Sequence, residues 1–482
     1  MSILPGHKTK TIGWFYLLTA AFLVTGFYVL LKKESLLFFA LPVVLVIAYY
    51  YIISLDKVLL FITLATPLAI TLDNSAIGAA LSFPTEPLMF GVLLIFLINI
   101  LFGEPYNRKI SHHPLSYIIY FSLFWMLVTS FTSEIPLVSF KQLLSRIWFV
   151  VPFYFVAATL FRNKKYIHWF FGTYMLGLTI VIVYTLIRHA GYGFDEDAGH
   201  WVMTPFYNDH TAYGAALAMF LPVMAAYVFY PGISIAKRLL AAAAVALLVS
   251  AVILSYSRAA WLSIIVSFLV LILILLHIRF RWLLLSLALL LGIFFAFQNQ
   301  IFDKLAKNKQ DSSNNMTEHL QSMSNISSDA SNLERINRWA SAIRMFEQRP
   351  WLGWGPGTYQ FVYAPFQRAS ERTVISTNTG DRGNAHSEYL GPLAEQGIPG
   401  LLGVLFLFGF AVYTGLKVYH HGSGDVRFLS LMATLGLITY FVHGFLNDFL
   451  NTDKLSVPVW GFMAIIVALD IYHLKTEHCE KT

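Results

Sequence analysis

The chain has 482 residues, of which 57% are hydrophobic and only 12% charged, and its mean hydropathy is +0.63. A soluble domain carries about 25% charged residues, so this composition excludes an ordinary soluble protein and indicates a polytopic membrane protein. The net charge of +7 is spread between apolar segments, which favours topology signals over nucleic-acid binding.

Apolar runs long enough to cross a bilayer, roughly 17–25 residues, recur along almost the whole chain. The sequence therefore predicts an all-α membrane protein with about fourteen transmembrane helices (12–14), of which the third and fourth are short. The expected spans are residues 12–31, 36–54, 58–72, 88–102, 115–131, 143–161, 168–187, 211–230, 239–254, 259–277, 282–297, 401–418, 428–449 and 456–473. The first is expected to be a retained helix rather than a signal peptide, because no small-residue cleavage site follows it.

The positions of lysine and arginine predict the orientation of these spans. Alternate loops carry basic residues and the loops between them are acidic or neutral, with Lys32-Lys33 as the exception. Cytoplasmic loops are the basic ones, so both termini are expected on the cytoplasmic side of the membrane.

A polar stretch of about ninety residues, from Gln300 to Tyr389, separates the eleventh and twelfth expected spans and is placed on the outward side. Its first part, residues 308–332, is rich in Ser, Asn and Gln and is expected to be disordered. Residues 333–347 show helical periodicity that stops before Pro350. We therefore expect three regions: a membrane region 1–298, an outward catalytic loop 299–397, and a membrane region with a short tail, 398–482.

Three arginines in two motifs are candidate anion ligands. Arg258 stands in Ser-Arg-Ala-Ala-Trp where two apolar segments meet on the outward side, and Arg335 and Arg338 lie three apart on one face of the loop helix. The guanidinium group matches phosphate oxygens and keeps its charge. The alternatives are a snorkelling arginine for Arg258 and a solvated amphipathic helix for the other two.

Two histidines are candidates for the chemistry. His386 lies in Asn-Ala-His-Ser-Glu-Tyr just before an apolar helix, and imidazole suits proton transfer near neutral pH. His210 follows Asp209 at an outward helix end, where these residues could orient sugar hydroxyls or Asp209 could cap the helix. A structural role remains the alternative for each.

Other patterns do not support a cofactor or a metal. The glycine-rich stretch 353–357 lacks the Lys-Ser/Thr ending of a phosphate loop and is interpreted as a turn. The single cysteine, Cys479, excludes disulfides within the chain, and no cluster has metal-ligand spacing. We predict no cofactor and no metal site.

Taken together, the motifs resemble the O-antigen ligase and polymerase family of membrane glycosyltransferases. That family carries His, then Asn, Ser or Gln, nine residues, and Gly-x-x-Gly, which His386, Ser387, Gly397 and Gly400 match. Ser257-Arg258-x-x-Trp261, Arg335 with Trp339, and Pro350-x-x-Gly353-x-Gly355 match further elements in the same order. The resemblance is specific from about residue 257 to 401, and Arg338 has no assigned counterpart.

The resemblance implies an enzyme that moves a glycan from undecaprenyl diphosphate to a hydroxyl of lipid A–core or another glycan acceptor, with inversion. His386 would be the base, and Arg258 and Arg335 would hold the diphosphate. Arg338 is a further candidate for diphosphate binding because it lies on the same helix face as Arg335, not because of the resemblance. Supporting roles would fall to Asp209, His210, Ser387, Glu395, Gly397 and Gly400, with Glu395 placed to orient His386. The expected partners are the lipid-linked donor, the glycan acceptor and membrane lipid, without nucleic acid.

Other functions remain open at this point. A polymerase would use a second lipid-linked repeat unit as its acceptor, and fourteen spans with a long insert favour it. Protein O-glycosylation is a further choice of acceptor. A polysaccharide or lipid transporter would place paired charges at the bilayer midplane, whereas the centres of these helices are almost free of charge.

Overall fold

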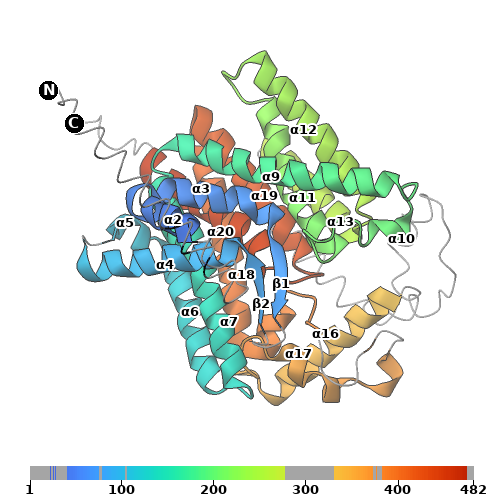
Figure 1. The fold of residues 1–482 in the computed structure, drawn as a ribbon. Helices are drawn as coiled ribbons and strands as arrows, with labels where there is room; N and C mark the ends of the chain where they lie inside the picture. The colour runs from blue at the N-terminus through green and yellow to red at the C-terminus, as the bar shows by residue number, and fades with distance from the viewer. Residues whose placement is uncertain are drawn as a thin grey trace. The chain divides into compact units, whose positions relative to one another are not determined.

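The computed structural model describes residues 22, 25, 28, 41–74, 79–103, 106–276, 330–372, 376 and 383–474. The chain forms two compact units, residues 1–58 and 59–482. The first contributes α2 (Leu41–Ile53) and the start of α3 (Leu55–Ala65). The architecture below concerns the second unit, which carries the other elements (Figure 1).

Within the described residues of this unit, ten helices are long and apolar enough to cross a membrane, and each overlaps one of the predicted spans. They are α4 (Thr85–Phe102), α6 (Pro114–Phe131), α7 with α8 (Pro136–Val150 and Ala157–Leu160, joined by a π-helical turn Val151–Val156), α9 (Lys164–Ala190), α11 (His210–Val228), α12 (Ile235–Leu254), α13 (Arg258–Leu275), α18 (Leu390–His421), α19 (Gly424–His443), and α20 (Asp453–Ala468) with the π-helical turn Leu469–His473.

The remaining described elements are short, apart from α16. They are α5 (Arg108–Ser111), α10 (Glu196–Gly199), α16 (Ala330–Gln348), α17 (Tyr359–Val362), strands β1 (Ile70–Asn74) and β2 (Ala79–Phe83), and the 3-10 helices Thr66–Leu68, Ala364–Phe366 and Ala369–Glu371. The strands pair as an antiparallel hairpin with Ile70 opposite Phe83.

The structure confirms the helical, multi-pass fold but not the count of fourteen spans. The candidate 282–297 lies outside the described ranges, as do the candidate 12–31, apart from residues 22, 25 and 28, and most of residues 308–332. The expected third span, 58–72, is wrong: α3 ends at Ala65, and the chain passes through a 3-10 turn into β1. Eleven residues cannot cross a bilayer. The chain turns at Pro67, which lacks the N–H that a continuing helix needs.

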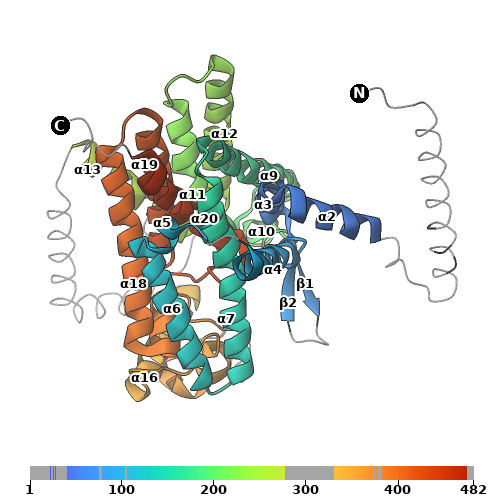
Figure 2. The same cartoon turned by 90° about the vertical axis from the view of Figure 1, so that its left-hand side faces the viewer.

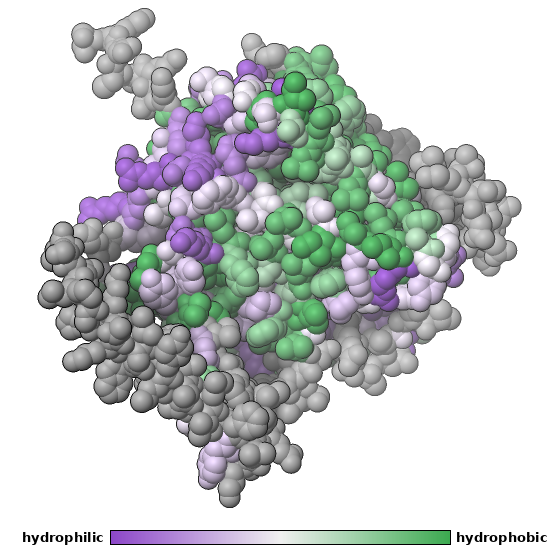
Figure 3. All heavy atoms as spheres, turned by 45° about the horizontal axis from the view of Figure 1, so that its top comes forward, coloured by the Kyte–Doolittle hydropathy of each residue, from purple (hydrophilic) through white to green (hydrophobic). Residues whose placement is uncertain are grey.

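Burial separates central helices from peripheral ones. In α19 and α20, 78% and 83% of the spanning window is buried, against 22–33% in α4, α6, α12 and α13. The outer helices are as apolar as the inner ones, so their exposed faces suit lipid rather than water. Figure 3 shows such a surface, with a broad hydrophobic area and hydrophilic residues gathered towards one side.

The predicted loop helix is confirmed as α16, which ends before Pro350. It packs against α18 and lies with α17 at one end of α18, α6 and α7 (Figures 1 and 2). Buried side chains of this region form a small core of their own, made of Ala342, Met345, Tyr359, Tyr363, Ala385 and Ala394. The polar segment therefore has a packed part that holds residues 383–389 against the first turns of α18.

Candidate functional site

His386 stands on a short, strongly constrained segment that leads into α18. Its backbone φ is +47°, which is unusual for a residue other than glycine. The side-chain oxygen of Asn384 accepts a hydrogen bond from the His386 amide at 3.2 Å. The Ser387 hydroxyl accepts from the amides of Tyr389 and Leu390 at 3.3 Å, so it caps the start of α18.

Glu388 fixes the same segment from the membrane side. Its carboxylate is buried, and Oε1 accepts hydrogen bonds from the Tyr440 hydroxyl at 2.5 Å and from the amides of Phe449 and Leu450 at 2.7 and 2.9 Å. Its own amide donates to the carbonyl of Gly444 at 2.8 Å. The segment is therefore tied to the turn between α19 and α20, which is why a strained conformation can persist at His386.

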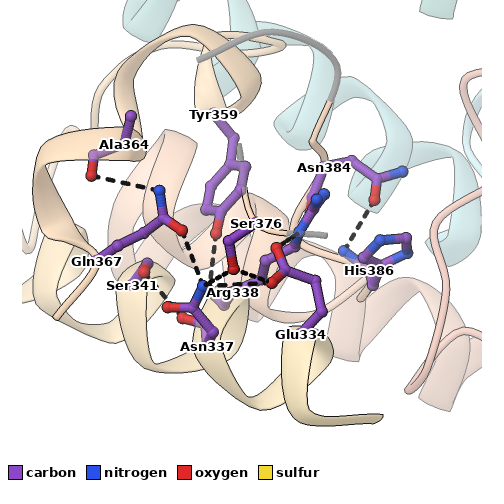
Figure 4. Close-up of polar contacts among 10 residues, drawn as sticks. All are labelled: Glu334, Asn337, Arg338, Ser341, Tyr359, Ala364, Gln367, Ser376, Asn384 and His386. Atoms are coloured by element: carbon purple, nitrogen blue, oxygen red, sulfur yellow. Dashed lines mark hydrogen bonds and ion pairs between the residues drawn. The ribbon is translucent and has the colours of Figure 1, made fainter. Parts of the chain in front are cut away.

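Arg338 fixes the segment from the α16 side. Nε of Arg338 donates to Glu334 at 2.8 Å, Nη1 donates to the carbonyl of Asn384 at 3.2 Å, and the guanidinium lies over the ring of Tyr363. Figure 4 shows Arg338 with Glu334 and Asn384, with the His386 ring directed away from Glu334. The charge of Arg338 is already balanced by a buried carboxylate, so this geometry suits positioning of residues 384–386.

The charge of Arg335 links this predicted site residue to two others, His386 and His210. That charge acts on both His386 and His210, although the two histidines are 176 positions apart in sequence, and the charge of Arg258 also acts on His210. Arg335 is half-buried on α16, and Arg258 is half-buried at the first turn of α13. The structure thus brings a cationic centre and two imidazoles to one end of the helices.

The surroundings of Arg258 hold its helix start in place. The Trp261 indole donates to the carbonyl of Val252 at 2.9 Å, and the Tyr256 hydroxyl donates to the carbonyl of Phe194 at 2.9 Å. Tyr256 has a φ of +50°, so the turn between α12 and α13 is tight. These bonds fix the position of Arg258 at the first turn of α13.

Asp209 and His210 have different surroundings. Asp209 caps α11, accepting from the amides of Thr211 and Ala212 at 2.7 and 2.8 Å, which is the capping role considered for it. His210 stacks on the exposed ring of His200, with ring centroids 4.3 Å apart. His200 was not predicted, since nothing in the spacing of these residues indicates that they stack.

Burial lowers the pKa of His386 to about 3, and the charges of Arg338 and Arg335 act in the same direction. The imidazole is therefore neutral at physiological pH and has a lone pair that can accept a proton. An anion placed beside the arginines would offset their charge and raise this pKa towards its ordinary value.

Glu395 and Gly397 hold the glycine-rich turn rather than His386. The Glu395 carboxylate accepts from the amide of Tyr359 at 3.0 Å, and its carbonyl accepts from the amide of Gly355 at 2.8 Å. Gly397 has φ +69° and ψ −163°, and a Cβ there would collide with the carbonyl oxygens of Pro350 and Trp351. Among the described contacts, the hydrogen bonds of Glu395 go to this turn, so its expected role in orienting His386 is not what the geometry shows.

Gly400 lies one turn beyond the kink, where a Cβ would meet Gln396 of its own helix. Among the residues that the structure describes, no group of three or more His, Cys, Asp or Glu side chains is placed to hold a metal ion.

The fold and this site define a multi-pass helical membrane protein with a histidine and arginine centre at the ends of its helices. Residues 243–405 match the family model of the O-antigen ligases, a stretch that includes Arg258, Arg335, His386 and Gly400. This region, about a third of the chain, is therefore similar to the O-antigen ligases, a family of membrane enzymes of the glycosyltransferase type that act on lipid-linked glycans and glycan acceptors. No curated protein matches the chain.

Proposed function

We propose that the chain is an inverting glycosyltransferase of the O-antigen ligase type, which moves a glycan from undecaprenyl diphosphate to a hydroxyl of lipid A–core on the periplasmic face of the inner membrane. The observation that supports this most is the shared influence of Arg335 on His386 and His210, with Arg258 acting on His210. A group that takes a proton and groups that stabilise a leaving anion are then within electrostatic range of one another.

The reaction follows from these roles. The acceptor hydroxyl oxygen forms a bond to the anomeric carbon while the bond from that carbon to the diphosphate oxygen breaks. The electron pair leaves with the diphosphate, where the charges of Arg258 and Arg335 stabilise it. The proton of the attacking hydroxyl passes to the neutral imidazole of His386.

Arg338 and Glu388 act through His386 in this proposal. Arg338 was predicted to bind the diphosphate, but its bonds to Glu334 and to the Asn384 carbonyl favour a positioning role. Glu388 supports the same segment from the opposite side. His386 is thereby held in one orientation before substrate arrives, which reduces the entropy cost of reaching a productive geometry.

The test is lipopolysaccharide gel profiling of cells that lack this gene and carry either the unaltered chain or His386→Ala. Base catalysis contributes about 10²–10⁴-fold, so His386→Ala should abolish the ladder and leave lipid-linked polymer accumulating. His421→Ala is the matched control, because this exposed histidine lies at the opposite end of α18.

The gel also separates the acceptors. A core bearing a single repeat would show a polymerase instead of a ligase. A normal ladder with His386→Ala, at normal protein level, would contradict the proposed role of this residue. A ladder unchanged by loss of the gene would move the search to other glycans, protein acceptors among them, and then to transport.

A further inference from the structure

A cavity opens between α6, α7, α18 and α20, beside the segment that carries His386. Around it, α6 packs against both α7 and α18 (Figure 2). Together with its open mouth the cavity measures about 630 Å³, so a ligand can enter from outside. Much of its wall is apolar and is formed by Ile119, Leu123, Met126, Val404, Leu407 and Phe408. Glu388, two residues after His386, also lines the cavity, which therefore adjoins the site described above.

The carboxylate of Glu388 has one oxygen that the protein itself does not use. Its Oε1 accepts the hydrogen bonds from Tyr440, Phe449 and Leu450. Among the described contacts Oε2 accepts none, although the side chain is buried. A buried carboxylate oxygen without a donor is unfavourable. Because Glu388 lines the cavity, a donor that enters there would satisfy this oxygen.

Arg146 lines the same cavity from α7. One of its five N–H groups is used in the contacts that the structure describes, where Nη2 donates to Oδ1 of Asn451 at 3.0 Å. The charge of Glu388 acts on Arg146, yet no ion pair joins them among the described residues. Separated charges inside a protein are unfavourable unless something between them makes the missing bonds. A donor and an acceptor thus line one cavity without meeting.

Trp460 of α20 supplies a second donor at this cavity. Its side chain is 3% exposed and contributes to the wall, and its indole N–H is buried without a hydrogen-bond acceptor. A buried indole normally finds a partner for this group. Three side chains from distant parts of the chain therefore have unused hydrogen-bonding capacity at one place.

The chemistry of these three groups decides which ligand fits the cavity. A hydrocarbon chain would leave all of them unsatisfied and would exclude water from them. A free anion would be repelled by Glu388, and a free cation by Arg146. A hydroxyl group both donates and accepts, so neighbouring hydroxyls can bond to Glu388 and to Arg146 at the same time. A sugar ring carries such hydroxyls, and its C–H groups suit the apolar wall.

We propose that this cavity binds a sugar ring of one of the two glycan substrates, with Oε2 of Glu388 accepting a hydrogen bond from one hydroxyl and Arg146 and Trp460 donating to others. The inference rests on the proposed function, because it names where the transferase holds carbohydrate beside His386. The contact is non-covalent. A ring held next to residue 388 restricts the position of its glycan relative to the base, which lowers the entropy cost of reaction.

The experiment measures glycan binding by calorimetry to the purified full-length chain in lipid nanodiscs, so that no sugar-headed detergent competes. Two probes come from cells that lack the gene. One is the core oligosaccharide, released from its lipid by mild acid, and the other is the glycan of the accumulated lipid-linked polymer, released in the same way. A loss of affinity confined to the first probe assigns the cavity to the acceptor, and a loss confined to the second assigns it to the donor.

Glu388→Gln is the decisive variant, because its amide keeps an oxygen at the Oε1 position and places an NH₂ group at the Oε2 position. The acceptor in the cavity becomes a donor, so the Kd for the bound glycan should rise about tenfold or more. Trp460→Phe keeps a ring but removes the N–H, and should raise the Kd about threefold or more. Glu347→Gln is the matched control, since Glu347 is exposed near the end of α16.

Arg146→Met should also raise the Kd about tenfold, with Arg238→Met as its control because Arg238 is exposed on α12. Bound glycan should raise the unfolding temperature of the unaltered chain and of both controls, but not that of Glu388→Gln. A variant that binds weakly, yet unfolds without glycan at the unaltered temperature, has lost a ligand contact rather than its fold. If Arg146→Met does not fold, Glu388→Gln and Trp460→Phe decide.

Unchanged Kd values in Glu388→Gln and Trp460→Phe would overturn the inference, because water alone would then satisfy these groups. So would failure of the unaltered chain to bind either glycan. Either result, together with loss of the ladder in His386→Ala, would leave the proposed function standing. Weakened binding in Glu388→Gln with a normal ladder in His386→Ala would instead support the sugar site and contradict the proposed role of His386.

Discussion

At the scale of single residues, His386 combines an unfavourable backbone with an unfavourable environment for charge. A φ of +47° costs a residue with a Cβ about 1–2 kcal/mol. Burial and two nearby arginines oppose protonation of its ring. Hydrogen bonds of Asn384, Ser387 and Glu388 stabilise this conformation and hold the neutral imidazole in a fixed position.

The lowered pKa of His386 predicts how its replacement changes the stability of the protein in acid. Below pH 6.5 the unfolded chain takes up a proton at this ring, whereas the folded chain does not until about pH 3. Folding stability is therefore lost as the pH falls through 6.5, by up to about 2 kcal/mol at pH 5.

His386→Gln removes this contribution, so its thermal unfolding temperature should fall less between pH 7.5 and 5 than that of the unaltered chain. Tryptophan fluorescence in detergent measures the unfolding temperature of each protein. Parallel curves for the two proteins would mean that the folded ring protonates normally.

Glu388 carries a second prediction at this scale. Glu388→Ala leaves the amides of Phe449 and Leu450 and the Tyr440 hydroxyl without their acceptor, at about 1–3 kcal/mol for each buried group. Glu388→Gln keeps an oxygen at the same place and should cost less. Denaturant or thermal unfolding of the two variants would test this, and equal losses would show that the acceptor oxygen is not what holds the turn.

At the scale of elements, the kink in α18 joins the polar segment to the membrane helices. At Gly397 the helix leaves regular geometry, and the amide of Ile398 donates to the carbonyl of Pro350 at 2.9 Å. The glycine-rich turn 353–357, which follows Pro350, also contacts the connection between α6 and α7. There the amide of Glu134 donates to the carbonyl of Trp354 at 3.0 Å. The predicted boundary at residues 397–398 thus falls on the kink of one continuous helix.

A pair of glycine variants in α18 tests the kink. Gly397→Ala introduces a Cβ into a conformation essentially restricted to glycine and against two carbonyl oxygens, so we expect a loss of at least about 1–3 kcal/mol and of glycan transfer. Gly409→Ala in the same helix meets nothing within 4 Å and should be neutral or slightly stabilising. Thermal unfolding and the lipopolysaccharide gel would be compared, and equal behaviour of the two variants would contradict the role of the kink.

At the scale of the whole molecule, Lys454 connects segments far apart in the sequence. Its buried ammonium group donates to the carbonyls of Thr66 and Ala69 at 2.7 and 2.6 Å and lies 5.3 Å from the centre of the Tyr207 ring. The 3-10 turn, the start of α20 and the segment before Asp209 are therefore held together by one cation.

Lys454→Met should destabilise the protein by about 3–5 kcal/mol, because it leaves buried carbonyl oxygens unpaired and removes the positive charge beside Asp453 and Glu86. Lys141→Met is the control, since Lys141 is exposed. The measurement is thermal unfolding in detergent. Similar unfolding temperatures for both variants would show that Lys454 does not hold these segments together.

The sequence by itself determined the features that depend on local pattern. Apolar length predicted ten of the helices, because a spanning helix must satisfy its backbone internally and face lipid. Periodicity and Pro350 predicted α16, and the order of motifs around Arg258, Arg335 and His386 predicted the family. The span predicted at 58–72 was wrong, because hydropathy alone does not distinguish a short buried helix from a strand.

Only the tertiary structure decided what depends on contacts between distant residues. It placed Arg335 where its charge reaches His210, His386 and His443, and it directed Glu395 to the turn at Tyr359. It also identified Glu388 as an anchor, for which the sequence offered only a carboxylate before an apolar helix. The partners of these side chains come from other helices, and their meeting depends on packing that no local pattern encodes.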